Sequence, residues 1–101
     1  MTTRFIVSSE AAADLREIVD FIAENNPSAA HRFLARMREE IGRIAAHPRI
    51  GHARMDLTDR PLRFWPVARY LVIYREEVGK PVEVVRVLHS ARDVAALLEP
   101  G

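Results

Sequence analysis

The clearest structural signal in the sequence is the stretch from Ala68 to Leu88, ARYLVIYREEVGKPVEVVRVL. Its two ends, residues 68–75 and 82–88, are rich in β-branched and aromatic residues and are apolar on both faces, as strands in the interior of a sheet are. Residues 76–81 between them contain a glycine and a proline and predict a turn. The stretch therefore predicts two neighbouring antiparallel strands.

Two further strands extend this pair. Residues 62–65 alternate with a period of two and predict a short strand just upstream, which gives a three-stranded antiparallel meander. Residues 3–8 alternate weakly around a short apolar run and predict an N-terminal strand. We expect the meander to complete one sheet with that strand.

Two amphipathic helices separate the first strand from the others. Apolar residues recur at helical spacing over residues 10–24, with Ser9 as the expected N-cap. This helix ends before Pro27, because a residue that precedes proline is disfavoured in the helical region. A second helix, capped by Ser28, continues until His47-Pro48. The short link between the helices predicts an antiparallel hairpin.

A short helix through Leu98, capped by Ser90 or Asp93, is expected to close the chain. The order is strand, two helices, three strands and a short helix, which is typical of an α+β protein. A chain of 101 residues has room for one core, so residues 1–101 are expected to form a single domain. The helical hairpin should cover one face of the sheet.

Several classes of function are disfavoured by composition. The chain has no cysteine, which excludes disulfides and thiolate metal sites. His47 and His52 have no spacing typical of a metal site, and neither a glycine-rich phosphate loop nor a GxSxG serine motif is present. We expect no cofactor and no metal. The apolar runs at 5–7 and 70–74 are too short for a signal peptide or a membrane span, which favours a cytoplasmic protein without membrane contact.

Positive charge is concentrated in the middle of the chain. Net charge is only +1, yet residues 47–75 carry six arginines against two aspartates. Such a segment is suited to an anionic partner, although a solvated basic surface is an equal alternative.

Four polar residues lie within eight positions at the end of the last predicted strand and just after it: Arg86, His89, Arg92 and Asp93. Arg86 lies within an apolar strand and is expected to pair with an acid such as Asp14 or Glu17, while Asp93 is expected to fix the chain reversal. His89 and Arg92 are open to either a structural or a functional role, and a structural His89 would bond to a backbone carbonyl. For general acid–base chemistry on RNA, His89 with Arg63, Arg86 and Arg92 would supply the proton-transfer group and the cations.

Aromatic residues near the basic segment suggest a protein-binding surface. Trp65, Tyr70 and Tyr74, with Arg63 and Arg69, are of the types that dominate interface hot spots. We expect Tyr74 and Phe64 to pack under the helical hairpin instead. Alternation places Trp65 opposite Phe64, which favours an exposed Trp65 available to a partner.

Four segments in order resemble the RelE/ParE superfamily of toxins from bacterial type II toxin–antitoxin systems. Residues 11–30 are similar to the family's opening hairpin, and HPRIG (47–51) to its Pro-x-x-Gly loop. Residues 60–75, RPLRFWPVARYLVIYR, resemble its strand pair ending in Tyr-Arg, and VVRVLHSARD (84–93) its closing motif. The resemblance covers nearly the whole chain and implies the α+β toxin fold.

The superfamily has two activities. RelE-like members cut messenger RNA on the ribosome, whereas ParE-like members poison DNA gyrase and are not nucleases. The closing LHSARD followed by VAALL is more similar to the ParE branch. In addition, no tyrosine follows Tyr74 and residues 94–101 contain no basic residue, unlike RelE-like sites. The resemblance thus implies a gyrase poison that acts by binding and not as an enzyme; alternatives are a ribosome-dependent RNase using His89, Arg86 and Arg63, and an inactive relic.

The resemblance also implies a partner and its contacts. A ParD-like antitoxin would form a hetero-oligomer with the toxin through a segment that folds on binding. We expect it to contact Arg60, Arg63, Trp65 and Arg69, and we expect His89 and Arg92 to contact gyrase. The toxin alone is not expected to bind nucleic acid in a sequence-specific manner.

Overall fold

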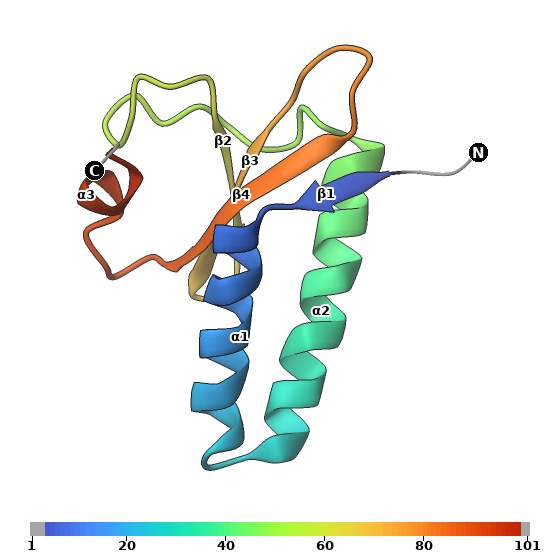
Figure 1. The fold of residues 1–101 in the computed structure, drawn as a ribbon, viewed down its shortest axis with the longest axis vertical. Coiled ribbons are helices and arrows are strands. Elements are labelled where there is room, and N and C mark those ends of the chain that lie inside the picture. Colours follow the sequence, from blue (N-terminus) through green and yellow to red (C-terminus); the bar gives the residue numbers. More distant parts are fainter. Residues whose placement is uncertain (1–3, 100–101) are drawn as a thin grey trace.

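A four-stranded sheet with the order β1-β4-β3-β2 forms the centre of the structure, a computed structural model that describes residues 4–99. The strands are β1 (Phe5–Val7), β2 (Arg63–Val67), β3 (Tyr70–Arg75) and β4 (Val82–His89). β2, β3 and β4 form an antiparallel meander, and β1 pairs with β4 in parallel. Figure 1 shows β1 beside β4, so the prediction of one sheet is confirmed. The predicted start of the first strand at residue 3 lies outside the described residues.

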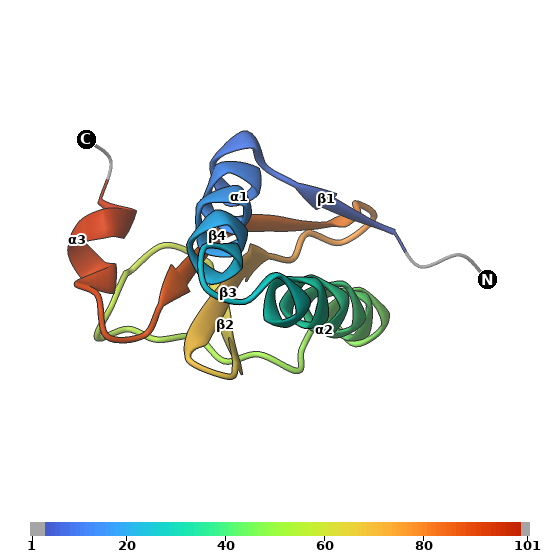
Figure 2. The ribbon, with the colours of Figure 1, turned by 90° about the horizontal axis from the view of Figure 1, so that it is seen from below.

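The helices also confirm the predicted order. α1 (Ser9–Ala23) and α2 (Pro27–Ala46) form the antiparallel hairpin, which extends beyond one end of the sheet (Figure 1). The short α3 (Val94–Leu98) lies apart from that hairpin (Figure 2). No helix within residues 4–99 combines the length and the apolar content needed to cross a bilayer.

The sheet has a core on each face. On the face covered by the hairpin, the buried cluster includes Met37 and Ile44 of α2 with Val72 and Tyr74 of β3. On the other face, Val94 and Leu98 of α3 pack with Leu62, which precedes β2, and with strand residues of the meander: Phe64, Leu71, Ile73 and Leu88. Because successive strand residues point to opposite faces, β3 is buried on both and contributes to each core.

This arrangement corrects two predictions. Phe64 is buried, but on the α3 side and not under the hairpin. Trp65 does point the opposite way, yet that direction leads to the hairpin core, where it is partly buried and donates from Nε1 to Glu40 Oε1 (2.9 Å). The predicted alternation of Phe64 and Trp65 is confirmed, but both faces of the sheet are covered, and not only the face under the hairpin. Tyr74 packs on the hairpin side as predicted.

The helix caps differ slightly from those predicted. Ser8, not Ser9, caps α1, and its Oγ accepts a hydrogen bond from Ala11 N (3.0 Å). Asn26, not Ser28, caps α2, because Pro27 fits the first helical position, where a missing N–H costs nothing. For α3, Asp93 is the cap among the two candidates.

Beyond the end of β1, Ser8 and Asp14 bond to the backbone of β4 in place of a strand. Ser8 donates from its backbone N to Val84 O (2.9 Å) and from Oγ to Val85 O (2.9 Å). Farther along, Asp14 Oδ2 accepts from Val87 N (2.9 Å). Val85 is the extra residue of a β-bulge, since Tyr74 pairs with Val84 and the preceding residue of β3 pairs with Arg86. β1 has only three residues, so it pairs with only part of the edge of β4. Polar side chains bond to the rest of that edge.

Candidate functional site

Arg86 serves as a latch between elements, as predicted. Its Nε donates to Asp14 Oδ2 (2.8 Å) and its Nη2 to Asp14 Oδ1 (3.0 Å), in a two-point contact. Its remaining nitrogen, Nη1, donates to Leu97 O of α3 (3.3 Å). The hydrogen bond to Asp14 raises the pKa of Arg86. All three guanidinium nitrogens are thus bound within the fold.

His89 ends β4 and is held from two sides. Its Nδ1 accepts from Ala91 N (3.0 Å), where the sequence had suggested a bond to a carbonyl. Its ring stands edge-on to Tyr70, with 5.2 Å between centroids. A neutral ring whose Nδ1 accepts must carry its proton on Nε2. Within residues 4–99 that N–H has no hydrogen-bond acceptor, so it is available to a partner.

His89 and Arg92 lie together. Both line a small hollow of about 60 Å³, with Tyr70 and the two acids Asp14 and Glu17 of α1 on its other sides. Arg92 is exposed and His89 is half-buried. Arg69 of the neighbouring turn is exposed too, and its carbonyl accepts from both N and Oγ of Ser90 (2.8 and 3.0 Å). We call Arg69, Tyr70, His89 and Arg92 the strand-exit surface.

The three residues of the RNase alternative are not assembled. Arg63 pairs with Tyr74 at one end of β3, and His89 pairs with Tyr70 at the other. Four residues of strand separate these positions by about 13 Å. The Arg86 guanidinium is bound to Asp14 and α3. General acid–base catalysis needs its groups around one phosphate, and this conformation does not provide that.

Arg63 instead supports a buried clamp that sequence analysis missed. The Tyr74 hydroxyl donates to Pro48 O (2.6 Å) and accepts from Gly51 N (2.9 Å), while Arg63 Nη1 donates to Gly51 O (2.7 Å). Burial raises the pKa of Tyr74. The clamp fixes the HPRIG loop against β2 and β3. The available signal was the Pro-x-x-Gly spacing, which places one acceptor and one donor at the two ends of a turn.

The four residues predicted to bind an antitoxin lie in three places. Arg63 and Trp65 lie on the hairpin side, and Arg69 belongs to the strand-exit surface. Arg60 lies on the α3 side, where its Nη1 donates to Leu98 O (3.1 Å). The structure does not gather them into one patch, so a partner that contacts all four has to wrap around the molecule.

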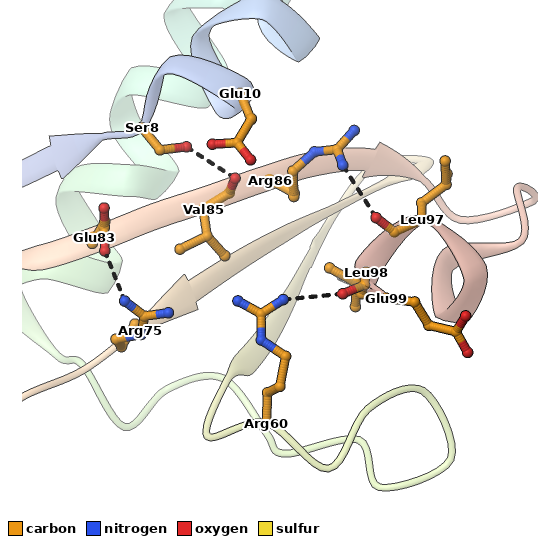
Figure 3. Close-up of a pocket in the computed structure, with 10 residues that line it drawn as sticks. All are labelled: Ser8, Glu10, Arg60, Arg75, Glu83, Val85, Arg86, Leu97, Leu98 and Glu99. Carbon is orange, nitrogen blue, oxygen red and sulfur yellow. Dashed lines mark hydrogen bonds and ion pairs between the residues drawn. The ribbon is translucent and has the colours of Figure 1, made fainter. Parts of the chain in front are cut away.

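A larger groove lies between α3 and the sheet, with a volume of about 610 Å³. Figure 3 shows ten residues that line it: Ser8, Glu10, Arg60, Arg75, Glu83, Val85, Arg86, Leu97, Leu98 and Glu99. The segments that supply them range from the start of α1 to the end of α3, so the sequence alone does not indicate the groove. Arg75 was not among the residues predicted to form a site. Among the described residues, no cluster of three or more His, Asp or Glu side chains is arranged to hold a metal ion.

Comparison with known proteins establishes the family. The family model described as the ParE toxin of the type II toxin–antitoxin system parDE matches residues 5–94. The chain belongs to the ParE toxin family. All four segments that carry the resemblance fall within this match, and the assignment to the ParE branch is confirmed.

Individual ParE proteins support the same assignment. Toxin ParE1 of Mycobacterium tuberculosis is 34% identical over 96 residues, which covers 93% of this chain and 96% of that protein. Toxin ParE3 of Caulobacter vibrioides is 34% identical over 97 residues, with 94% of each chain covered. A solved structure described as the chromosomal ParDE TA system from P. aeruginosa superposes with a TM-score of 0.70 at 20% identity, covering 86% of this chain and 95% of that one. That likeness shows a shared fold.

Proposed function

We propose that this ParE-family toxin poisons DNA gyrase by binding to it and is neutralised by a cognate ParD-like antitoxin. The family match over residues 5–94 carries the proposal. The bound state of Arg86 supports action by binding and not by RNA cleavage, since its guanidinium is fixed to Asp14. A gyrase target would place the toxin in the cytoplasm.

The strand-exit surface is our candidate for the gyrase contact. It combines two exposed arginines with the free Nε2–H of His89 and the edge of Tyr70. Aromatic rings and arginine are the side chains that most often dominate interfaces. Ala91 N and Tyr70 fix the orientation of His89, so little conformational entropy is lost when a partner binds.

A ParD-like antitoxin would form a hetero-oligomer with the toxin and contact Arg60, Arg63, Trp65 and Arg69. Since these residues lie in three places, a segment that is extended or folds on binding fits better than a compact partner. Arg63 and Trp65 already bond to Gly51 and Glu40, so they present only part of their side chains to a partner.

A supercoiling assay with gyrase, plasmid and the purified chain tests the proposal, with linear plasmid measured in the same reactions. We expect linear plasmid to accumulate with the wild type. His89→Ala and Arg92→Ala should each weaken this effect about tenfold, which corresponds to a loss of about 1.4 kcal/mol of binding free energy. Arg36→Ala, at an exposed position of α2, is the matched control and should act like the wild type.

Supercoiling that continues normally, with no linear plasmid, would contradict the gyrase proposal. The RNase alternative would then be tested by messenger RNA cleavage on ribosomes with the same variants. Equal loss in Arg36→Ala and His89→Ala would contradict the strand-exit surface while leaving the gyrase target intact.

A further inference from the structure

The turn between β2 and β3 holds a strained residue. Val67 pairs with Tyr70, so Ala68 and Arg69 form the tight turn at the end of these two strands (Figure 2). Ala68 has a φ of +54°, and within residues 4–99 no other residue except glycine has a positive φ. A positive φ at the first of two turn residues alone is typical of a type II′ turn, where glycine is preferred because it has no Cβ to meet the backbone. With alanine at this position, the turn retains a steric cost.

The backbone of Arg69 is held from its other side as well. Its carbonyl accepts from Ser90 N (2.8 Å) and from Ser90 Oγ (3.0 Å). The first bond continues the ladder beyond the last pair of β3 and β4, whereas the second comes from a side chain that the ladder does not need. The next residue, Tyr70, packs edge-on against the rings of both Phe33 and His89, with 5.2 Å between centroids in each case.

The side chain of Arg69, in contrast, is left free by the fold. The residue is exposed, and no carboxylate within residues 4–99 lies within salt-bridge distance of its guanidinium. Strained residues persist where the surrounding structure over-determines them, and they concentrate at sites that contact ligands. The turn fits that description, because the residues around Arg69 fix its backbone while its charged group remains available.

We propose that the strained turn presents Arg69 to the target of the toxin, and that Ala68 and Ser90 are positioning residues that act through it. The inference rests on the proposed function in naming gyrase as that target. The Cβ of Ala68 costs stability, yet it leaves the turn fewer conformations than glycine would. Arg69 is therefore ordered before the target arrives, and less conformational entropy is lost when the two bind. Some stability is thus exchanged for affinity.

A purely structural turn is the alternative, and the two roles differ in one substitution. If Ala68 only closed the end of the sheet, Ala68→Gly would relieve the steric cost and leave activity unchanged. If Ala68 positions Arg69, the same change raises stability and lowers activity. The two measurements together therefore separate the roles.

Ala68→Gly is compared with the wild type by thermal unfolding and by the gyrase assay described above. We expect its melting temperature to rise by about 4 °C, because relief of the steric cost exceeds the entropy that glycine adds to the unfolded chain. About threefold more of the variant should be needed for the same amount of linear plasmid, since Arg69 then has to be ordered on binding. Arg69→Ala should require about tenfold more.

Matched variants separate positioning from stability. Gly42→Ala in α2 should also raise the melting temperature, since its Cβ would meet nothing within 4 Å, and it should poison gyrase like the wild type. Ser90→Ala should lose about threefold in potency, while Ser90→Thr, which keeps a hydroxyl for the Arg69 carbonyl, should lose less. Wild-type potency in Arg69→Ala, or in a stabilised Ala68→Gly, would overturn the inference.

Two readouts that do not involve purified gyrase distinguish failure of this inference from failure of the proposed function. The amide order parameter of Arg69, measured by NMR relaxation, should be about 0.85 in the wild type and lower in Ala68→Gly and Ser90→Ala. Induced expression in a bacterial host reports growth arrest whatever the target is, and Arg69→Ala should weaken that arrest.

A wild type without effect on gyrase would overturn the proposed function, and weaker growth arrest by Arg69→Ala would still support the inference. Equal order parameters at Arg69 in the wild type and Ala68→Gly would overturn the inference even if gyrase is the target.

Discussion

Tyr74 shows how a single side chain holds a loop that has no regular secondary structure of its own. It is fully buried, and its hydroxyl both donates to Pro48 O and accepts from Gly51 N. One hydroxyl therefore satisfies a carbonyl and an amide at the two ends of the HPRIG turn. Removing it would leave both groups without partners in a buried place.

The same burial makes stability depend on pH in the alkaline range. Below the ordinary tyrosine pKa of 10.0 the phenol is neutral in both states, so the clamp contributes fully. Because burial raises the pKa of Tyr74 in the folded protein, the unfolded chain ionises first as pH rises, and the free energy of unfolding falls from about pH 10 upward. Urea unfolding across this range should show the fall in the wild type.

Tyr74→Phe should reduce that fall and lower stability at neutral pH by about 1–2 kcal/mol, through the two unpaired backbone groups. Tyr70→Phe, which keeps the clamp, is the control. An identical alkaline profile in Tyr74→Phe and the wild type would show that the clamp is not the source.

Gly51 in the HPRIG loop and Gly42 in α2 differ in the space available for a side chain. A Cβ on Gly51 would lie 2.7 Å from Tyr74 Oη and 2.9 Å from Phe64 O, which is backbone and cannot rotate away. A Cβ on Gly42 of α2 would meet nothing within 4 Å. The same substitution should therefore have opposite effects in the clamped loop and in the helix.

We expect Gly51→Ala to lower the free energy of unfolding by about 1–3 kcal/mol through overpacking. Gly42→Ala should raise it by about 0.5–1 kcal/mol, since alanine is the better helix former. Thermal unfolding followed by circular dichroism measures both. A neutral Gly51→Ala would mean that the loop can move off Tyr74 without cost.

Element identity was predictable from local pattern, whereas element placement was not. Helical spacing and Pro27 indicated the hairpin, and the two-sided apolar strands indicated the centre of the sheet. Trp65 and Phe64 were assigned to the wrong surroundings because alternation separates two faces without saying what covers each. The groove depends on α3 folding back over the sheet, which no local pattern specifies.

One aspartate, Asp14, joins three segments that are distant in the sequence. Asp14 of α1 binds Arg86 of β4, accepts from Val87 N, and through Arg86 is connected to Leu97 O of α3. The sequence did suggest an acid of α1 as the partner of Arg86, because a charge inside an apolar strand requires one. Its contact with the backbone of β4 could not be inferred, since that depends on where β1 ends.

Asp14→Ala should therefore destabilise the protein by about 3 kcal/mol, since it leaves a partly buried guanidinium and a strand N–H unpaired. Its side chain is only 13% exposed, so solvent screening is limited. The exposed pair Arg54–Asp56 provides the control, and Asp56→Ala should change stability little. Equal urea midpoints for the two variants would contradict the role given to Asp14.

The parallel pairing of β1 with β4 has a consequence for synthesis of the toxin. Phe5 lies beside Val82, and Ser8 bonds to a residue 77 positions later. The ribosome therefore makes β1 well before β4, which is its neighbour in the sheet among residues 4–99. The sheet cannot close until β4 has been translated, and a nascent chain interrupted before Val82 would have neither the latch nor the groove.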